Sequence, residues 1–87
     1  MPESVPLIGT VALQRLFGFS AAEAGVAELL MEGLDRQEIA DRLSVSLNTI
    51  RTHLRSLFSK TSTSSQAKLV QLLLVAMRTV PHKIRRE

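Results

Sequence analysis

Hydrophobic residues recur at helical spacing over residues 46–60. Four of them fall on one side of a helix, at i, i+4, i+7 and i+8: Ile50, Leu54, Leu57 and Phe58. This stripe predicts a helix that packs against its neighbours by one face. The other side carries polar side chains: Asn48, Arg51, Thr52, Arg55 and Ser59. Because no segment of the chain shows a strand pattern, we expect an all-α domain.

Two earlier helices are indicated by their first residues. Ser20 and Glu23 have the spacing of a capping box, in which each side chain satisfies a free amide of the first turn, and Asp35 and Glu38 repeat this spacing. Gly33 stands where the first of these helices needs a left-handed cap. We therefore expect one helix from residue 20 to about residue 33 and a short second one from residue 35.

The two ends of the chain have a different character. Residues 1–18 contain Pro2, Pro6 and Gly9, and we expect a linker or a short N-terminal helical segment there, with its helix over residues 10–17. A last helix is expected over residues 65–79, and Pro81 ends the regular structure. The predicted domain therefore covers residues 19–80, and residues 81–87 form a basic tail.

Size and composition exclude several classes of protein. A chain of 87 residues holds one small core, with little room for a deep substrate cleft. The absence of cysteine excludes a disulfide framework, a cysteine zinc site and a thiol nucleophile. His53 and His82 are too isolated to form a metal pair. Because Glu23 and Glu38 are explained as capping residues, no catalytic set can be assembled, and we expect neither enzyme activity nor a cofactor.

Membrane insertion and secretion are not indicated. Residues 1–10 lack the basic start and the apolar run of a signal peptide. The longest apolar stretch, residues 69–77, is far shorter than the roughly 20 residues that a membrane span needs. We expect a soluble, cytoplasmic domain that does not interact with a membrane.

Charge is distributed unevenly along the chain. Residues 1–45 hold seven acidic and three basic side chains, whereas residues 46–87 hold eight basic and one acidic. Between Asp41 and Glu87 there is no acidic residue. Such asymmetry favours a polyanionic partner, and nucleic acid is the natural one. The alternative is an unevenly charged surface without a partner.

Three helices with a tight connection at residues 44–45 have the layout of a helix-turn-helix, whose second helix enters the major groove of double-stranded DNA. Arg51 and Arg55 lie one turn apart, and an arginine fork matches the two acceptors of a guanine edge. Asn48 and Thr52 can add base contacts. The first turn holds Ser46 and Thr49, which are suited to phosphates. Lys60 at the far end has no acidic neighbour in sequence. The alternative is an ordinary solvated helix face.

Residues 19–70 resemble the LuxR-type, or GerE-like, helix-turn-helix domain of bacterial transcription regulators. The family pattern is matched in register by these residues: Glu23, Gly33, Leu34, Glu38, Ile39, Ala40, Leu43, Ser46, Thr49 to His53, Leu54 and Lys60. The resemblance implies a small four-helix domain with a helix-turn-helix (winged-helix-like) core, which binds DNA as a homodimer and controls transcription. The linker-like start favours a piece of a longer regulator over a stand-alone protein.

The resemblance also implies roles for single residues. Arg51, Thr52 and Arg55 match positions that face bases. Four residues match positions on or near the phosphate backbone: Ser46, Thr49, His53 and Lys60. Gln37 replaces a lysine that meets a phosphate in many relatives, and Arg36 beside it can compensate for the missing charge.

The last helix is more apolar than one packing face requires. Residues 72–77 are all apolar and cover every side of a helix, so part of this surface needs another partner. The family dimerises through this helix, which implies an interface of Val70, Leu73, Leu74 and Met77. The competing explanation is a regulatory domain that normally packs there. The alternative function is an all-helical protein-interaction or dimerisation module that uses helix 65–79.

Overall fold

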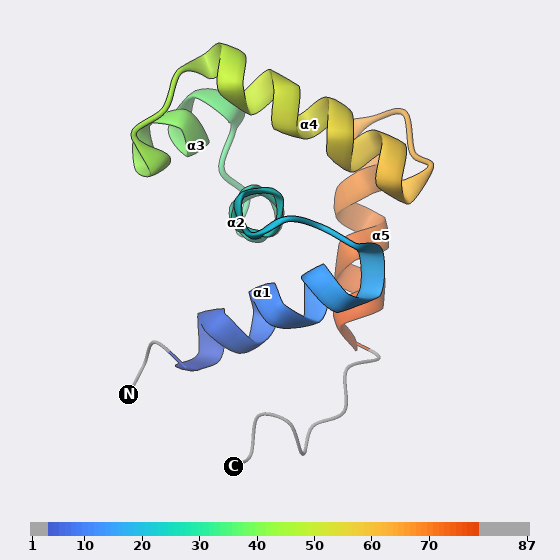
Figure 1. Ribbon diagram of the computed structural model, residues 1–87. Coiled ribbons are helices and arrows are strands. Elements are labelled where there is room, and N and C mark those ends of the chain that lie inside the picture. The colour runs from blue at the N-terminus through green and yellow to red at the C-terminus, as the bar shows by residue number, and fades with distance from the viewer. Residues whose placement is uncertain (1–3, 79–87) are drawn as a thin grey trace.

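Helix α2 (Ala21–Met31) lies at the centre of the molecule, with the other helices around it (Figure 1). The computed structural model describes residues 4–78, which form five helices and no strand. The other four are α1 (Ser4–Phe17), α3 (Arg36–Leu43), α4 (Leu47–Thr61) and α5 (Gln66–Arg78). The prediction of an all-α domain is confirmed, and in this range the helix-turn-helix core carries no β wing.

Both predicted capping boxes are present. The Ser20 hydroxyl accepts from the Glu23 amide at 3.1 Å, and the Glu23 carboxylate accepts from the Ser20 amide at 2.9 Å. Asp35 and Glu38 make the same reciprocal pair, with both distances 2.8 Å. These bonds satisfy amides that have no partner inside the helix, so the starts of α2 and α3 are determined locally.

The connection between α3 and α4 is a tight turn around Ser44. This residue adopts the left-handed conformation, with φ 58° and ψ 43°. The next amide, of Val45, donates back to the Ala40 carbonyl at 3.0 Å, which closes the last turn of α3 in a Schellman motif. Ser46 then caps α4, so only three residues separate the two helices.

One core joins all five helices. Its largest fully buried side chains come from α1 to α5: Leu13, Val26, Ile39, Ile50, Leu54, Leu57, Leu69 and Leu73. The apolar stripe of α4 lies against this core as predicted, with Phe58 half-buried at its edge. A fully buried leucine or isoleucine contributes about 1.5–3 kcal/mol, so this packing holds the apolar face of α4 against the domain.

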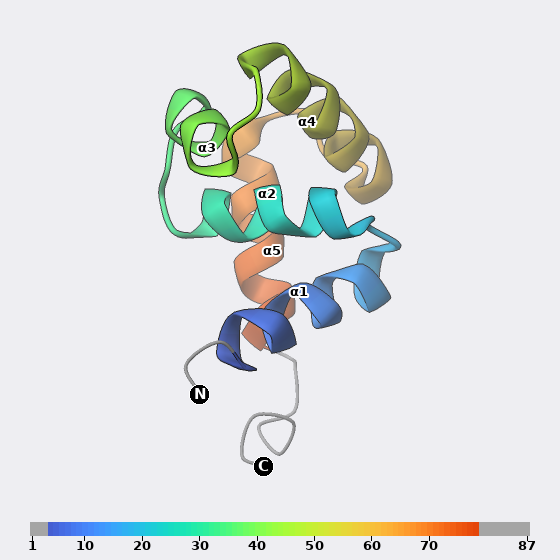
Figure 2. The same cartoon turned by 60° about the vertical axis from the view of Figure 1, so that its left-hand side comes forward.

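The N-terminal segment is a longer helix than the sequence indicated. Helix α1 begins at Ser4 instead of Thr10, and Pro6 falls in its first turn, where a missing amide hydrogen breaks no helical bond. α1 packs on the side of α2 away from α3 and α4 (Figures 1 and 2). Leu13 is fully buried there, and the stacked rings of Phe17 and Phe19 lie 5.1 Å apart. Helix α1 therefore packs onto the domain through its described side chains, such as Leu13.

Helix α5 buries one side and exposes another. Leu69 and Leu73 have no exposed surface, whereas Leu74 and Val75 are 45% and 46% exposed. Leu73 was expected at a dimer interface, but it belongs to the monomer's own core and offers no surface to a second chain. The expected end of this helix at residue 79 and the basic tail 81–87 lie outside the described residues. None of the described helices is long and apolar enough to cross a membrane.

Candidate nucleic-acid interface

The outer face of α4 is not covered by any other part of residues 4–78. Its polar residues are all exposed: Asn48, Arg51, Thr52, Arg55 and Ser59. Within residues 4–78 neither Arg51 nor Arg55 has a carboxylate partner. The buried stripe on the opposite side of α4 leaves these two guanidinium groups facing solvent, one helical turn apart. A cationic face of this kind can bind a polyanion without first breaking an ion pair.

The first turn of α4 is capped by a hydroxyl. Ser46 Oγ accepts from the Thr49 amide at 3.1 Å, and the two hydroxyls lie 3.0 Å apart. Ser46 is exposed, whereas Thr49 and the nearby His53 are half-buried. Ser46 is thus the N-cap of α4, and these three residues lie in its N-terminal half.

The two residues expected to contact phosphate from α3 are exposed but have partners within the chain. Gln37 Nε2 donates to Asp41 Oδ1 at 3.1 Å within α3. Arg36 Nε donates to Gln66 Oε1 at 3.1 Å, which joins the first turn of α3 to the first turn of α5. Arg36 keeps further N–H donors on the same fork, since a guanidinium has five.

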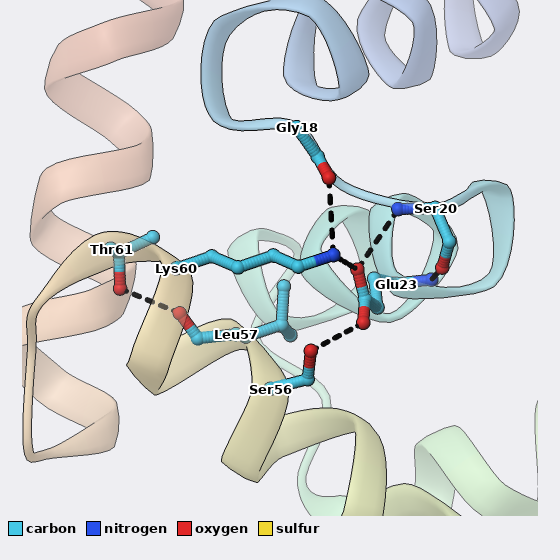
Figure 3. Close-up of polar contacts among 7 residues, drawn as sticks. All are labelled: Gly18, Ser20, Glu23, Ser56, Leu57, Lys60 and Thr61. Carbon is cyan, nitrogen blue, oxygen red and sulfur yellow. Dashed lines mark hydrogen bonds and ion pairs between the residues drawn. The ribbon is translucent and has the colours of Figure 1, made fainter.

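Lys60 lies in a different environment from the one its sequence suggested. Glu23 is 37 residues away along the chain, yet its Oε1 atom lies 2.7 Å from the Lys60 ammonium (Figure 3). The same ammonium donates to the Gly18 carbonyl at 3.1 Å. On the other side of the carboxylate, the Ser56 hydroxyl donates to Glu23 Oε2 at 2.5 Å. Sequence reasoning found neither the Ser56 contact nor the ion pair, because no local spacing signals a contact between α2 and α4.

Glu23 is held ionised by these contacts. Burial by itself raises the pKa of this carboxyl, but hydrogen bonds from Lys60, Ser56 and the Ser20 amide, together with the Lys60 charge, outweigh it and lower the pKa to about 2. The Glu23 side chain is 10% exposed and that of Lys60 36% exposed. Glu23 is therefore a capping residue of α2, as predicted, and also the centre of a polar cluster that reaches α4.

Negative charge gathers at another part of the surface. A shallow hollow at the corner between α2 and α3 has three acidic residues in its lining, Glu32, Glu38 and Asp41, together with Gly33, Leu34 and Arg42. Because like charges repel, this corner is unsuited to the phosphates of DNA. The described surface therefore separates an acidic corner from the cationic face of α4.

Together, the tight α3–α4 connection and the exposed cationic face of α4 define a helix-turn-helix DNA-binding protein. The chain belongs to the luxR family of bacterial regulatory proteins, whose family model matches residues 18–73. The match covers α2, α3, α4 and much of α5, and helix α1 precedes it. The domain is thus the DNA-binding output module of a transcription regulator, as the motif in register had indicated.

Several curated proteins resemble part of this chain. A protein of Aeromonas salmonicida named as an HTH-type transcriptional regulator is 39% identical over 59 residues, 68% of this chain and 30% of its own length. The monoamine regulon transcriptional regulator of Klebsiella aerogenes is 37% identical over 51 residues, 59% of this chain and 22% of its own. Response regulator Rre1 of a Synechocystis species is 36% identical over 56 residues, 64% and 24% of the two chains.

These relatives are much longer than the present chain, which spans between 22% and 30% of their lengths. No solved structure gives a significant match. The similarity to these relatives therefore extends over 51 to 59 residues of this chain.

Proposed function

We propose that this domain binds DNA in a sequence-specific manner, with α4 in the major groove. The observation that carries the proposal is the solvent-facing pair Arg51 and Arg55, one turn apart and without a carboxylate partner among residues 4–78. Each arginine can donate two hydrogen bonds to the O6 and N7 acceptors of a guanine, which is worth about 1–3 kcal/mol of discrimination. The major groove is wide enough to admit an α-helix, so both arginines can reach base edges together.

Asn48 and Thr52 complete the proposed base-reading set. Both are exposed on the same face of α4 as the two arginines. The Thr52 hydroxyl donates to the Asn48 carbonyl at 3.2 Å, so its hydroxyl proton is already used within the helix. Thr52 then offers its methyl group, which suits a thymine methyl, while the Asn48 amide suits an adenine edge.

Phosphate contacts are proposed near the starts of α3 and α4. Ser46 and Thr49 lie at the start of α4, where the helix dipole favours negative charge. His53, further along α4, is proposed as a third phosphate contact. Arg36 and Gln37 present donors from the first turn of α3. Lys60 is left out of this set because its ammonium is held by Glu23.

We further propose that the regulator acts as a homodimer through α5, works in the cytoplasm and has no catalytic step. Leu74 is exposed, and Val70 and Met77 are half-buried beside the core, so these three form the proposed interface. A dimer of helix-turn-helix domains reads two half-sites about 10–10.5 base pairs apart. A regulatory domain packed on α5 is the competing occupant, and the relative named as a response regulator makes it relevant.

A second function is favoured by the same exposed residues. If Leu74 and Val75 formed a surface that binds another protein, the domain would be a protein-interaction module. That function predicts no salt-dependent affinity for DNA, because it needs no phosphate contact.

Selection of binding sites from a random duplex library, repeated at two salt concentrations, tests the proposal. We expect an enriched motif with two related half-sites and an affinity that falls steeply with salt. Enrichment of no motif at either salt concentration would refute sequence-specific binding and leave the interaction module as the better explanation.

A further inference from the structure

One carboxylate joins α2 to two successive turns of α4. Ser56 and Lys60 are four residues apart and therefore lie on one side of α4. Each binds a different oxygen of Glu23: Lys60 Nζ lies 2.7 Å from Oε1, and Ser56 Oγ lies 2.5 Å from Oε2 (Figure 3). Since Lys60 also donates to Gly18, the C-terminal turn of α4 is tied to the segment just before α2.

The charges at the two helix ends agree with this arrangement. Glu23 lies in the first turn of α2 and Lys60 in the last turn of α4. A helix favours an anion at its N-terminus and a cation at its C-terminus, so each charge suits its own helix as well as the other charge. With Glu23 only 10% exposed, withdrawing Lys60 would leave a nearly buried carboxylate without its counter-charge.

Lys60 faces away from the groove-reading side of α4. Arg51 and Lys60 are nine residues apart. At 3.6 residues per turn, nine residues correspond to about 180° around the helix axis. When Arg51 points toward base edges, a side chain on the opposite side of α4 points toward the body of the domain. Lys60 does so, and there it contacts Glu23 of α2.

We infer that Glu23 and Lys60 are positioning residues, which set the orientation of α4 on the domain so that Arg51 and Arg55 reach base edges together. Lys60 thus acts on DNA binding through α4, and it makes no phosphate contact. This inference rests on the proposed function, because it assigns a role within the same DNA-binding face.

The salt dependence of DNA affinity distinguishes positioning from phosphate contact. Removing one phosphate contact lowers the slope of log K against log salt by about 0.9. We expect Lys60→Met to keep the wild-type slope and the wild-type affinity for random-sequence duplex. Its affinity for a duplex selected by the wild-type chain should fall about tenfold, because misaligning one bidentate arginine costs on the order of 1.4 kcal/mol.

The two possible roles of Lys60, positioning α4 and contacting phosphate, predict different results for Glu23→Gln. Glutamine keeps the capping box of α2 but removes the charge that holds Lys60. If Lys60 positions α4, this variant should lose selectivity as Lys60→Met does, and the double variant should be no worse than either single one. If Lys60 contacts phosphate, freeing it should leave affinity unchanged or raise it.

Two further variants keep the test valid. Lys68→Met removes an equal charge from an exposed position of α5 and should leave selectivity unchanged. Ser56→Ala removes only one hydrogen bond to Glu23, so it can replace the charge variants if those fold poorly. It should show a smaller loss of selectivity than they do. All measurements are made where circular dichroism shows each variant folded, so a loss of stability alone does not alter them.

Three results would overturn the inference. A reduced salt slope for Lys60→Met would show that Lys60 contacts phosphate. Unchanged selectivity of Glu23→Gln would show that the Glu23–Lys60 pair does not position α4. Both outcomes leave the proposed function intact, because the wild-type chain still selects a motif. If the wild-type chain selects none, the proposed function fails first and this inference fails with it.

Discussion

Glu28 and Gly9 face each other across the contact between α1 and α2, with the Glu28 carboxylate in the space that a β-carbon on Gly9 would fill. Burial raises the pKa of Glu28 above its ordinary value of 4.5, and the nearby Glu32 carboxylate raises it further. When a carboxyl group has a raised pKa in the folded state, folding is favoured at low pH, and this stability is lost as pH rises above the unfolded pKa.

The first prediction is that Glu28→Gln stabilises the domain at neutral pH. The free energy of unfolding should rise by up to about 1 kcal/mol at pH 7, because ionised Glu28 is disfavoured beside α1. The gain should shrink near pH 3.5, where the wild-type carboxyl is protonated in both states. Urea denaturation at the two pH values measures this. Equal stability of wild type and Glu28→Gln at pH 7 would contradict it.

The second prediction concerns acid unfolding. Because the folded protein lowers the pKa of Glu23 from 4.5 to about 2, this group stabilises the fold above pH 4.5, and the stability is lost as pH falls toward 2. Solvent around Lys60 weakens the ion pair, so the free energy of unfolding of wild type should exceed that of Glu23→Gln by roughly 2 kcal/mol at pH 7. Denaturation curves from pH 7 to pH 2 should show this difference disappear, and a difference that stays constant with pH would argue against the buried ion pair.

The third prediction concerns the two arginines of α4. Arg51→Ala and Arg55→Ala should each relax base preference at one position per half-site, at a cost of about 1–3 kcal/mol for the preferred base. Repeating the selection with each variant measures this. Lys68→Ala, which removes the same charge from α5, should return the wild-type motif. If Arg55→Ala returned the wild-type motif as well, the assignment of the reading face would be wrong.

The fourth prediction separates two neighbouring leucines of α5. Leu73 has no exposed surface, so Leu73→Ala should lower the free energy of unfolding by about 2–5 kcal/mol. Leu74 is 45% exposed, so Leu74→Asp should change monomer stability by no more than about 0.5 kcal/mol. It should instead weaken dimer formation, measured by sedimentation with and without DNA. Dimerisation of Leu74→Asp as strong as that of wild type would move the interface away from α5.

Much of the fold could be predicted because its signals are local. A capping box needs only residues three apart, and a buried stripe only a helical period, so the starts of α2, α3 and α4 follow from the sequence. The exposed face of α4 follows in the same way. Helix α1 begins earlier than expected from the sequence. A proline breaks the interior of a helix but is compatible with its first turn, where Pro6 lies.

The roles of Lys60 and Leu73 illustrate the opposite case. Along the sequence Lys60 is one more cation near Arg55, and Leu73 is one apolar residue among six. Only the packing of α2 against α4 brings Glu23 to Lys60, and only the core assigns Leu73 to the interior and Leu74 to the surface. The sequence alone therefore determined the helices, their caps and the cationic face, since these depend on neighbours within a few residues. The tertiary structure decided which charges are paired and which apolar residues stay exposed, because those depend on contacts between helices far apart in the chain.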